Sequence, residues 1–127
     1  MPPIEQRLVQ ALEAFNKAEE KKSYGGLRDY LAQYVVMTRI DDGTCVHGTP
    51  DQIIAYFNHS QAETKFWPTM ECDKAKWTVD EVKHVISGTG IYRDKGADQQ
   101  TAIPCMYRYH FTDDGKIDAA ITIPTNK

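Results

Sequence analysis

The sequence predicts an α+β fold in which helices lie against one side of a bent sheet. Three observations support this prediction. The N-terminal segment has the spacing of an amphipathic helix, a second helix with a clear cap lies between short strand-like segments, and long alternating segments fill the second half of the chain. A length of 127 residues with 41% hydrophobic content is typical of a single domain, which we expect to span residues 1–127.

The first helix is predicted by apolar residues spaced three and four apart. These residues are Ile4, Leu8, Ala11, Leu12, Phe15 and Ala18. Pro2 and Pro3 suit a first helical turn, and Gly25-Gly26 is expected to end the helix. A shorter helical stretch over residues 27–34 and a strand over 34–37 are expected to follow.

The second clear helix has a capping box at its start. Thr49 can accept a hydrogen bond from the backbone N–H of Gln52, Gln52 can reach back, and Pro50 takes the first helical position. A short strand over 44–47 is expected before this helix.

Three or four long antiparallel strands are predicted from Glu63 onward. The last two are joined by the turn Asp113-Asp114-Gly115. Their alternation predicts two buried faces. These faces are Ile103, Cys105, Tyr107, Tyr109 and Phe111, followed by Ile117, Ala119, Ile121 and Ile123.

Composition excludes several classes of partner. The net charge of −3 and the absence of a basic run argue against nucleic acid. No apolar stretch approaches the roughly 20 residues that span a bilayer, so no membrane association is expected. The three cysteines are well separated and odd in number, which favours reduced thiols and a cytoplasmic location.

Several segments resemble the nuclear transport factor 2-like superfamily, which includes SnoaL-like polyketide cyclases and ketosteroid isomerases. Residues 47–57, HGTPDQIIAYF, resemble the start of the third helix of that family. Residues 107–117, YRYHFTDDGKI, are similar to its final hairpin, and Phe15-Asn16-Lys17-Ala18 fits its first helix. The resemblance therefore spans nearly the whole chain.

This resemblance implies a cone-shaped domain, with a strongly curved antiparallel sheet wrapped around about three N-terminal helices. It also implies a pocket at the open end and a homodimer formed through the sheets. It does not fix the function, because the family contains isomerases, dehydratases, cyclases, epoxide hydrolases, transport factors and kinase association domains.

The residues of a ketosteroid isomerase are largely missing. Such an enzyme needs an Asp base and two oxyanion donors, a Tyr and a protonated carboxylic acid. By the family resemblance, the base falls near Thr38 or Arg39, the acid near Tyr107 and the helix Tyr near Ala11. Only Tyr107 can still donate a hydrogen bond, so we expect no steroid isomerisation.

Other candidate residues follow from residue type and expected placement. His84 alternates with Val82 and Ile86 and is expected to face the interior, and Asp29 is a candidate buried carboxylate, so both join Tyr107 as weak catalytic candidates. The structural role is the more ordinary one for two of them, since Tyr107 can simply pack its ring and His84 can be a core or rim histidine. The candidate ligand-binding residues are Tyr30, Tyr34, Trp67, Trp77, Cys105 and Tyr107.

No metal or cofactor is expected. The histidines are not at ligand spacing and no Cys-x-x-Cys pair occurs. Residues 88–93 begin like a dinucleotide fingerprint but carry Arg93 where the third Gly belongs. Arg108 and His110 are expected on the face opposite Tyr107, with Asp118 pairing with Arg108.

Two functions remain open. The first is a protein that binds a small apolar ligand in a cone-shaped pocket, with isomerase, dehydratase or cyclase-type chemistry as an open question. The second is a non-catalytic dimeric module that binds protein through its exposed sheet. A pocket of roughly a few hundred cubic ångströms open to solvent, with a His or carboxylate within hydrogen-bond reach of Tyr107, would favour the first. A cavity filled by Trp and Phe rings would favour the second.

Overall fold

The computed structural model describes residues 3–38, 44–61, 67–95 and 102–125. Helix α1 (Ile4–Lys21) is followed by the 3-10 helix η1 (Gly25–Tyr30), strands β1 (Leu31–Thr38) and β2 (Cys45–Gly48), and helix α2 (Pro50–Gln61). The second half contains β3 (Trp67–Cys72), the 3-10 turn η2 (Lys74–Lys76), β4 (Thr78–Asp80), β5 (Val85–Lys95), β6 (Ala102–Phe111) and β7 (Ile117–Pro124). The predicted α+β class is confirmed.

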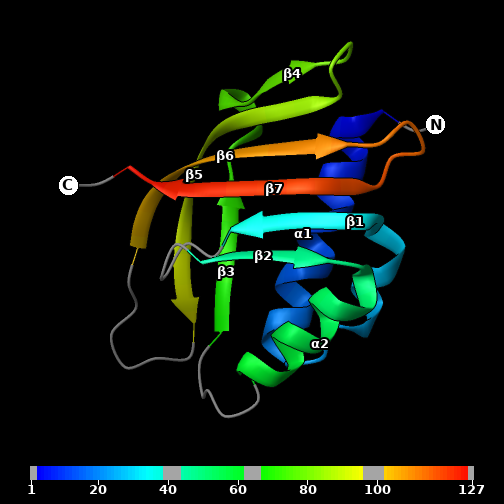
Figure 1. Ribbon diagram of the computed structural model, residues 1–127. Coiled ribbons are helices and arrows are strands. Elements are labelled where there is room, and N and C mark those ends of the chain that lie inside the picture. Colours follow the sequence, from blue (N-terminus) through cyan, green and yellow to red (C-terminus); the bar gives the residue numbers. More distant parts are fainter. Residues whose placement is uncertain (1–2, 39–43, 62–66, 96–101, 126–127) are drawn as a thin grey trace.

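The strands form one curved, unclosed sheet in the order β2-β1-β7-β6-β5-β3, with β4 paired to β5. Figure 1 shows that β3 and the end of β5 run across the direction of β6 and β7, with α1 behind the sheet. The curvature gives the sheet an inner face toward α1 and an outer face turned away from it. One pairing differs from the expected antiparallel sheet, because β1 and β7 are parallel.

Helix α1 has the amphipathic pattern that the sequence predicts. Ile4, Leu8 and Ala11 are buried against the sheet. The helix ends before Gly25-Gly26, because Lys22 adopts the left-handed conformation (φ 54°) and its backbone N–H reaches back to the last turn.

The helix predicted over residues 27–34 is wrong. A 3-10 helix ends at Tyr30, and Leu31 already starts β1. Tyr34 therefore follows strand alternation, which places it on the opposite face from the buried Val35.

The capping box at the start of α2 is confirmed. The backbone N–H of Thr49 donates to Gln52 Oε1 at 2.8 Å, and the backbone N–H of Gln52 donates to Thr49 Oγ1 at 3.3 Å. Ile53, Ile54 and Phe57 of α2 are buried in the second of two apolar clusters.

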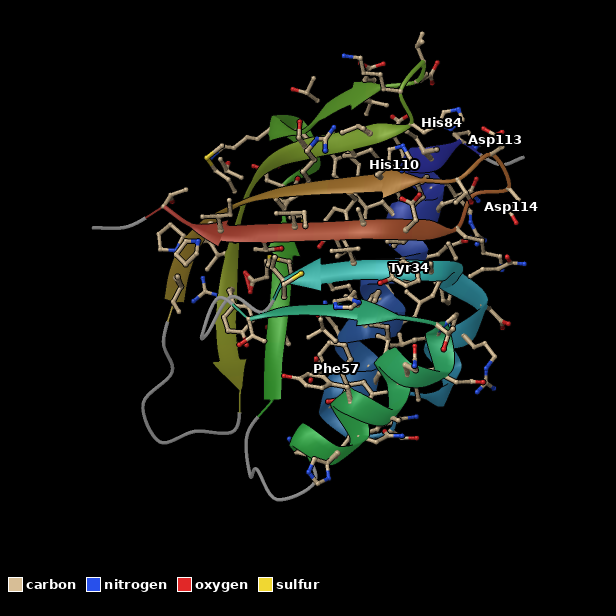
Figure 2. The ribbon with its side chains drawn as sticks, in the orientation of Figure 1. Tyr34, Phe57, His84, His110, Asp113 and Asp114 are labelled. Carbon is tan, nitrogen blue, oxygen red and sulfur yellow. The ribbon has the colours of Figure 1, made fainter. Side chains whose placement is uncertain are left out.

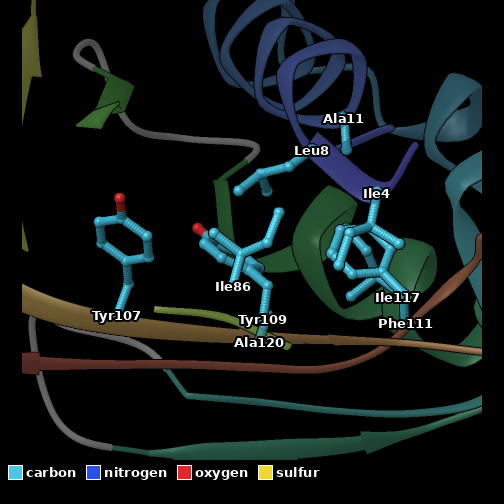
Figure 3. Packing of buried hydrophobic residues seen from close by; sticks show 9 residues of the cluster. All are labelled: Ile4, Leu8, Ala11, Ile86, Tyr107, Tyr109, Phe111, Ile117 and Ala120. Carbon is cyan, nitrogen blue, oxygen red and sulfur yellow. The ribbon is translucent and has the colours of Figure 1, made fainter. Parts of the chain in front are cut away.

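The first apolar cluster lies between α1 and the inner face of the sheet (Figure 3). Its buried members are Ile4, Leu8, Ala11, Ile86, Tyr107, Tyr109, Phe111, Ile117 and Ala120. The predicted alternation along β6 is confirmed, because Cys105, Tyr107, Tyr109 and Phe111 are all buried.

The alternation predicted for β7 is wrong beyond Ile117. His110 pairs with Ala119 but Phe111 pairs with Ile117, so Asp118 is an extra residue in the ladder, a β-bulge. The bulge shifts the inward position from Ala119 to the buried Ala120. Ile121 then lies opposite the exposed Arg108, on the outer face.

Candidate functional site

Tyr107 stands at one end of an aromatic row on the inner face. Strand alternation places Tyr107, Tyr109 and Phe111 side by side along β6, and the rings of Tyr107 and Tyr109 have centroids 5.5 Å apart. Figure 3 shows Leu8 and Ile4 of α1 over the Tyr109 and Phe111 part of the row, with Tyr107 beyond them. The hydroxyl of Tyr107 thus points into the part of the interior that these α1 side chains do not cover.

The Tyr107 hydroxyl is buried and makes no well-formed hydrogen bond with a described residue. The residue is only 2% exposed. Burial raises the pKa of its phenol above the usual value, and the neighbouring Cys72 adds to that effect. Because Tyr107 keeps its proton at neutral pH, it is a hydrogen-bond donor inside the protein that lies near the Cys72 thiol but makes no well-formed bond to a described residue.

A glycine on the neighbouring strand makes room for this hydroxyl. Gly88 of β5 is the direct partner of Tyr107, and a Cβ built on Gly88 would lie 2.8 Å from Tyr107 Oη. The same Cβ would lie 3.0 Å from the Cα of Trp77. The Tyr107 hydroxyl and the Trp77 backbone therefore crowd the same face of Gly88, which explains why no side chain fits there.

Two cysteines lie near Tyr107 on the inner face. Burial raises the pKa of the Cys72 thiol to about 12, and it also raises the pKa of the Cys105 thiol. Both side chains are therefore neutral thiols at physiological pH, and neither has the lowered pKa of a reactive nucleophile.

An open groove of about 460 Å³ lies between α1 and the segment that precedes β4. It is lined by Glu5, Gln6 and Val9 of α1 and by Trp77. Trp77 is half-buried and also packs on the inner apolar cluster. Trp77 therefore borders both the groove and the inner apolar cluster.

No histidine or carboxylate bonds to the Tyr107 hydroxyl among the described residues. At the position of the catalytic base, Thr38 bonds to the backbone of Thr122. Its hydroxyl accepts from the Thr122 N–H at 2.8 Å and donates to the Thr122 carbonyl at 3.1 Å. Ala11, at the position of the helix Tyr, is buried. Arg39, the alternative base position, lies outside the described residues.

The other two catalytic candidates are not brought to Tyr107. Asp29 is exposed in η1, which corrects the expectation of a buried carboxylate. His84 lies in the turn before β5 and not in a strand, with its carbonyl bonded to the backbone N–H of Phe111 at 2.9 Å. Its ring faces the exposed Asp113, with the two groups 3.5 Å apart (Figure 2).

Three of the six candidate ligand-binding residues border the inner apolar cluster or belong to it: Tyr30, Trp77 and Tyr107. Cys105 is buried on the same inner face as Tyr107. The Tyr30 ring is covered by the Arg7 guanidinium, 5.5 Å from its centroid. The side chain of Trp67 lies outside the described part of the structure.

Tyr34 is on the outer face, which corrects the expectation that it lines the interior. Its side chain is 56% exposed, and its hydroxyl lies 2.6 Å from Nδ1 of His47 on β2. The helical spacing assumed for residues 27–34 caused the error, since the residue belongs to a strand.

The outer face also carries a histidine–carboxylate pair. His110 Nδ1 lies 2.5 Å from Asp118 Oδ1, so Asp118 pairs with His110 and not with Arg108 as the sequence suggested. The bulge at Asp118 turns its side chain toward His110. An open pocket of about 400 Å³ beside Asp118 is also lined by Tyr34, Asp114 and Lys116.

Sequence reasoning missed Gly88 and Asn16. Asn16 on α1 bonds both backbone groups of Met70, accepting from its N–H at 3.1 Å and donating to its carbonyl at 3.3 Å. These bonds hold α1 against β3 beside the site. Gly88 could have been found from the strand register that places it opposite Tyr107. That register can be read only once the pairing of β5 with β6 is known.

Among the described residues, no group of three or more His, Cys, Asp or Glu side chains is placed to hold a metal ion. In the same part of the chain, no helix has both the length and the apolar character that a membrane crossing requires.

Solved structures with the same arrangement of elements identify the fold. An NTF2-like protein of unknown function from Exiguobacterium is 14% identical, with a TM-score of 0.67 over 95% of this chain and 99% of that one. The chain has the nuclear transport factor 2-like fold. An epoxide hydrolase of LEH-like type from M. tuberculosis (11% identity, TM-score 0.67, 94% and 83% covered) shares this NTF2-like fold.

A third structure with the same fold is a protein from Xanthomonas campestris that is provisionally assigned as a polyketide cyclase. It is 12% identical, with a TM-score of 0.62 over 95% of this chain and 92% of that one. No family profile and no curated protein matches the chain. At these identities the similarity establishes the fold and not the activity.

Proposed function

We propose that this NTF2-like protein binds a small apolar ligand carrying one hydrogen-bond acceptor, with Tyr107 as the donor to that acceptor. The observation that carries the proposal is the buried Tyr107 hydroxyl without a well-formed hydrogen bond to a described residue. An unsatisfied buried polar group costs about 1–3 kcal/mol, and a ligand carbonyl would recover much of that cost.

The surroundings of Tyr107 support a ligand that is mostly apolar. Tyr109 lies beside it along β6, and the backbone of Trp77 lies next to its partner Gly88. Cys72 and Cys105 are neutral thiols and behave as small, weakly polar groups. Flat apolar ligands suit such a wall, with the single donor fixing their orientation.

The neighbours in fold include an epoxide hydrolase and a provisionally assigned polyketide cyclase, so the architecture is compatible with catalysis. No described carboxylate or histidine bonds to Tyr107, however, and proton abstraction from a ketosteroid requires such a base. We therefore expect ligand binding without steroid isomerisation. A β,γ-unsaturated ketosteroid should isomerise to its conjugated enone no faster in the presence of the protein than in buffer.

Calorimetric titration with 1-indanone tests the binding proposal, with indane as the matched ligand that lacks the carbonyl. Tyr107→Phe should weaken indanone binding by about 1 kcal/mol, the scale of one hydrogen bond, which is roughly fivefold in the dissociation constant. Indane binding should not change. Tyr109→Phe is the matched control, because the hydroxyl of Tyr109 interacts with Thr122. Equal indanone affinity for wild type and Tyr107→Phe would contradict the proposal.

A protein-interaction role through the outer face is the second candidate. Met106 and Ile123 are direct partners across β6 and β7, and they are 56% and 58% exposed. Together with Tyr34 they place three large exposed side chains on one face of the sheet. We propose that this face forms a homodimer, and that the protein works in the cytoplasm, where its three free cysteines would stay reduced.

A further inference from the structure

The open groove of about 460 Å³ lies beside the segment that carries Trp77. Three side chains from the first turns of α1 also line it, Glu5, Gln6 and Val9, and Gln6 is exposed. Val9 directly follows Leu8, which is buried in the inner apolar cluster. One edge of α1 therefore faces the groove, while the adjacent positions pack inside the protein.

The Trp77 backbone is a direct neighbour of the Tyr107 hydroxyl. Thr78 of β4 pairs with Ser87 of β5, so Trp77 continues this register opposite Gly88. A Cβ on Gly88 would meet the Cα of Trp77 at 3.0 Å and Tyr107 Oη at 2.8 Å. Because both atoms approach the same point, Trp77 and Tyr107 meet across Gly88.

The Trp77 side chain borders both regions. It lines the groove and also packs on the inner apolar cluster, and it is half-buried. The cluster includes Tyr107, whose hydroxyl makes no well-formed hydrogen bond with a described residue. A short path from the groove to this hydroxyl therefore runs past the Trp77 ring.

The segment that carries Trp77, residues 74–80, is attached to the sheet through one short strand. It contains η2 and then β4, which has three residues and pairs with β5 alone in the described part of the chain (Figure 1). The hydrogen bonds around η2 are local, since the backbone N–H groups of Ala75 and Lys76 donate to Asp73 at 3.0 and 2.9 Å. Segments with few long-range hydrogen bonds open at a lower free energy than central strands. Trp77 can therefore move while the pairing of β5 with β6 stays intact.

We propose that the groove is the entrance to the Tyr107 site and that the Trp77 ring is its gate. In the closed state the ring packs on the inner apolar cluster, and in the open state it moves aside so that a flat apolar ligand passes. A gate that is closed in both the free and the bound protein raises the barrier to entry and to exit. It therefore lowers both the association and the dissociation rate constant.

This inference rests on the ligand site proposed above and adds the route by which the ligand reaches it. The probe is 5-fluoro-1-indanone, whose exchange between free and bound states is followed by ¹⁹F NMR line shapes. The line shapes give the dissociation rate constant. Together with the dissociation constant from calorimetry, they also give the association rate constant.

The first test blocks the groove without changing the interior. Gln6→Cys is combined with Cys45→Ser and coupled to a bulky maleimide, because position 6 is exposed whereas burial raises the pKa of Cys72 and Cys105. The label should lower both rate constants at least about tenfold. The matched control is the wild-type protein labelled at the exposed Cys45 on β2, which β1, β7 and β6 separate from β5. Its rate constants should equal those of the unlabelled protein.

The second test removes the ring. Trp77→Ala should raise the association rate constant at least about tenfold, whereas loss of a mere ligand contact would raise only the dissociation rate constant. Val79→Ala is the matched control, because Val79 of β4 also packs on the inner apolar cluster but does not line the groove. Thermal unfolding confirms that both variants are folded before the measurement.

The outcomes separate the gate from the ligand site. An unchanged association rate constant in either the labelled Gln6→Cys protein or folded Trp77→Ala would overturn the gate and leave the Tyr107 site in place. Failure of 5-fluoro-1-indanone to bind the wild-type protein would overturn the ligand site and the gate with it.

Discussion

The Tyr107 hydroxyl lies 2.8 Å from the point where a side chain on Gly88 would begin. The two residues are direct partners on β5 and β6, so the absence of a side chain at one position allows the ring of the other to lie across it. An aromatic ring that covers a glycine of the adjacent strand restores packing that the glycine cannot supply. This pair positions the donor on which the proposed ligand site depends.

Gly88→Ala should therefore destabilise the protein and displace Tyr107. The added methyl group meets Tyr107 Oη at 2.8 Å and the Trp77 backbone at 3.0 Å, so it must push one of them away. Overpacking of this kind costs about 1–3 kcal/mol, measurable by urea unfolding. Gly25→Ala is the control, since nothing lies within 4 Å of its Cβ position. Equal losses for both variants would show that the Gly88 contact is not tight.

Ile117→Ala should cost much more stability than Ile121→Ala. Ile117 is 1% exposed in the inner cluster, so its truncation leaves a cavity worth about 2–5 kcal/mol. Ile121 lies on the outer face beyond the Asp118 bulge, and its loss should cost about 1 kcal/mol or less. Chemical denaturation of the two variants measures the difference. A larger loss of stability for Ile121→Ala than for Ile117→Ala would show that the Asp118 bulge does not turn Ile121 to the outer face.

One of the three cysteines should react quickly with a thiol reagent at pH 8. Cys45 is exposed, whereas burial holds the pKa of Cys72 at about 12 and raises that of Cys105. Since the neutral thiol is favoured in the folded state, Cys72 reactivity should rise only as the pH approaches about 12 or as the protein unfolds. Ellman's reagent should give one fast equivalent, which Cys45→Ser removes. A fast phase that persists in Cys45→Ser would refute this assignment.

Met106→Glu and Ile123→Glu should dissociate the proposed homodimer. Each places a carboxylate on the exposed apolar pair of the outer face, where association would bury it. Multi-angle light scattering should give twice the mass of one chain for wild type and the monomer mass for both variants. Val82→Glu, at a 92% exposed position in the turn before β5, should stay dimeric. A wild-type protein that stays monomeric at all concentrations would contradict the proposed homodimer.

Local signals in the sequence predicted the local structure well. The spacing from Ile4 to Ala18, the Thr49–Gln52 capping box and the alternation along β6 each depend on neighbouring residues, and each is confirmed. The 3-10 helix before β1 was the local exception, because apolar residues at helical spacing also fit a turn followed by a strand.

Features that depend on register across strands could not be predicted. The Asp118 bulge moves Ile121 outward, and the parallel pairing of β1 with β7 joins segments far apart in the chain. The same limit applied to the site. Tyr107 was predicted from its alternation, whereas the position of Gly88 opposite it follows from strand pairing alone.

A crystal structure with bound 1-indanone would show directly whether Tyr107 is the donor to the ligand. We expect the ligand inside the curved sheet, with its carbonyl oxygen about 2.5–3.0 Å from Tyr107 Oη, the distance of an O–H···O hydrogen bond. A ligand in the open pocket beside Tyr34 and Asp118, with no hydrogen bond to the Tyr107 hydroxyl, would contradict the proposed role of Tyr107.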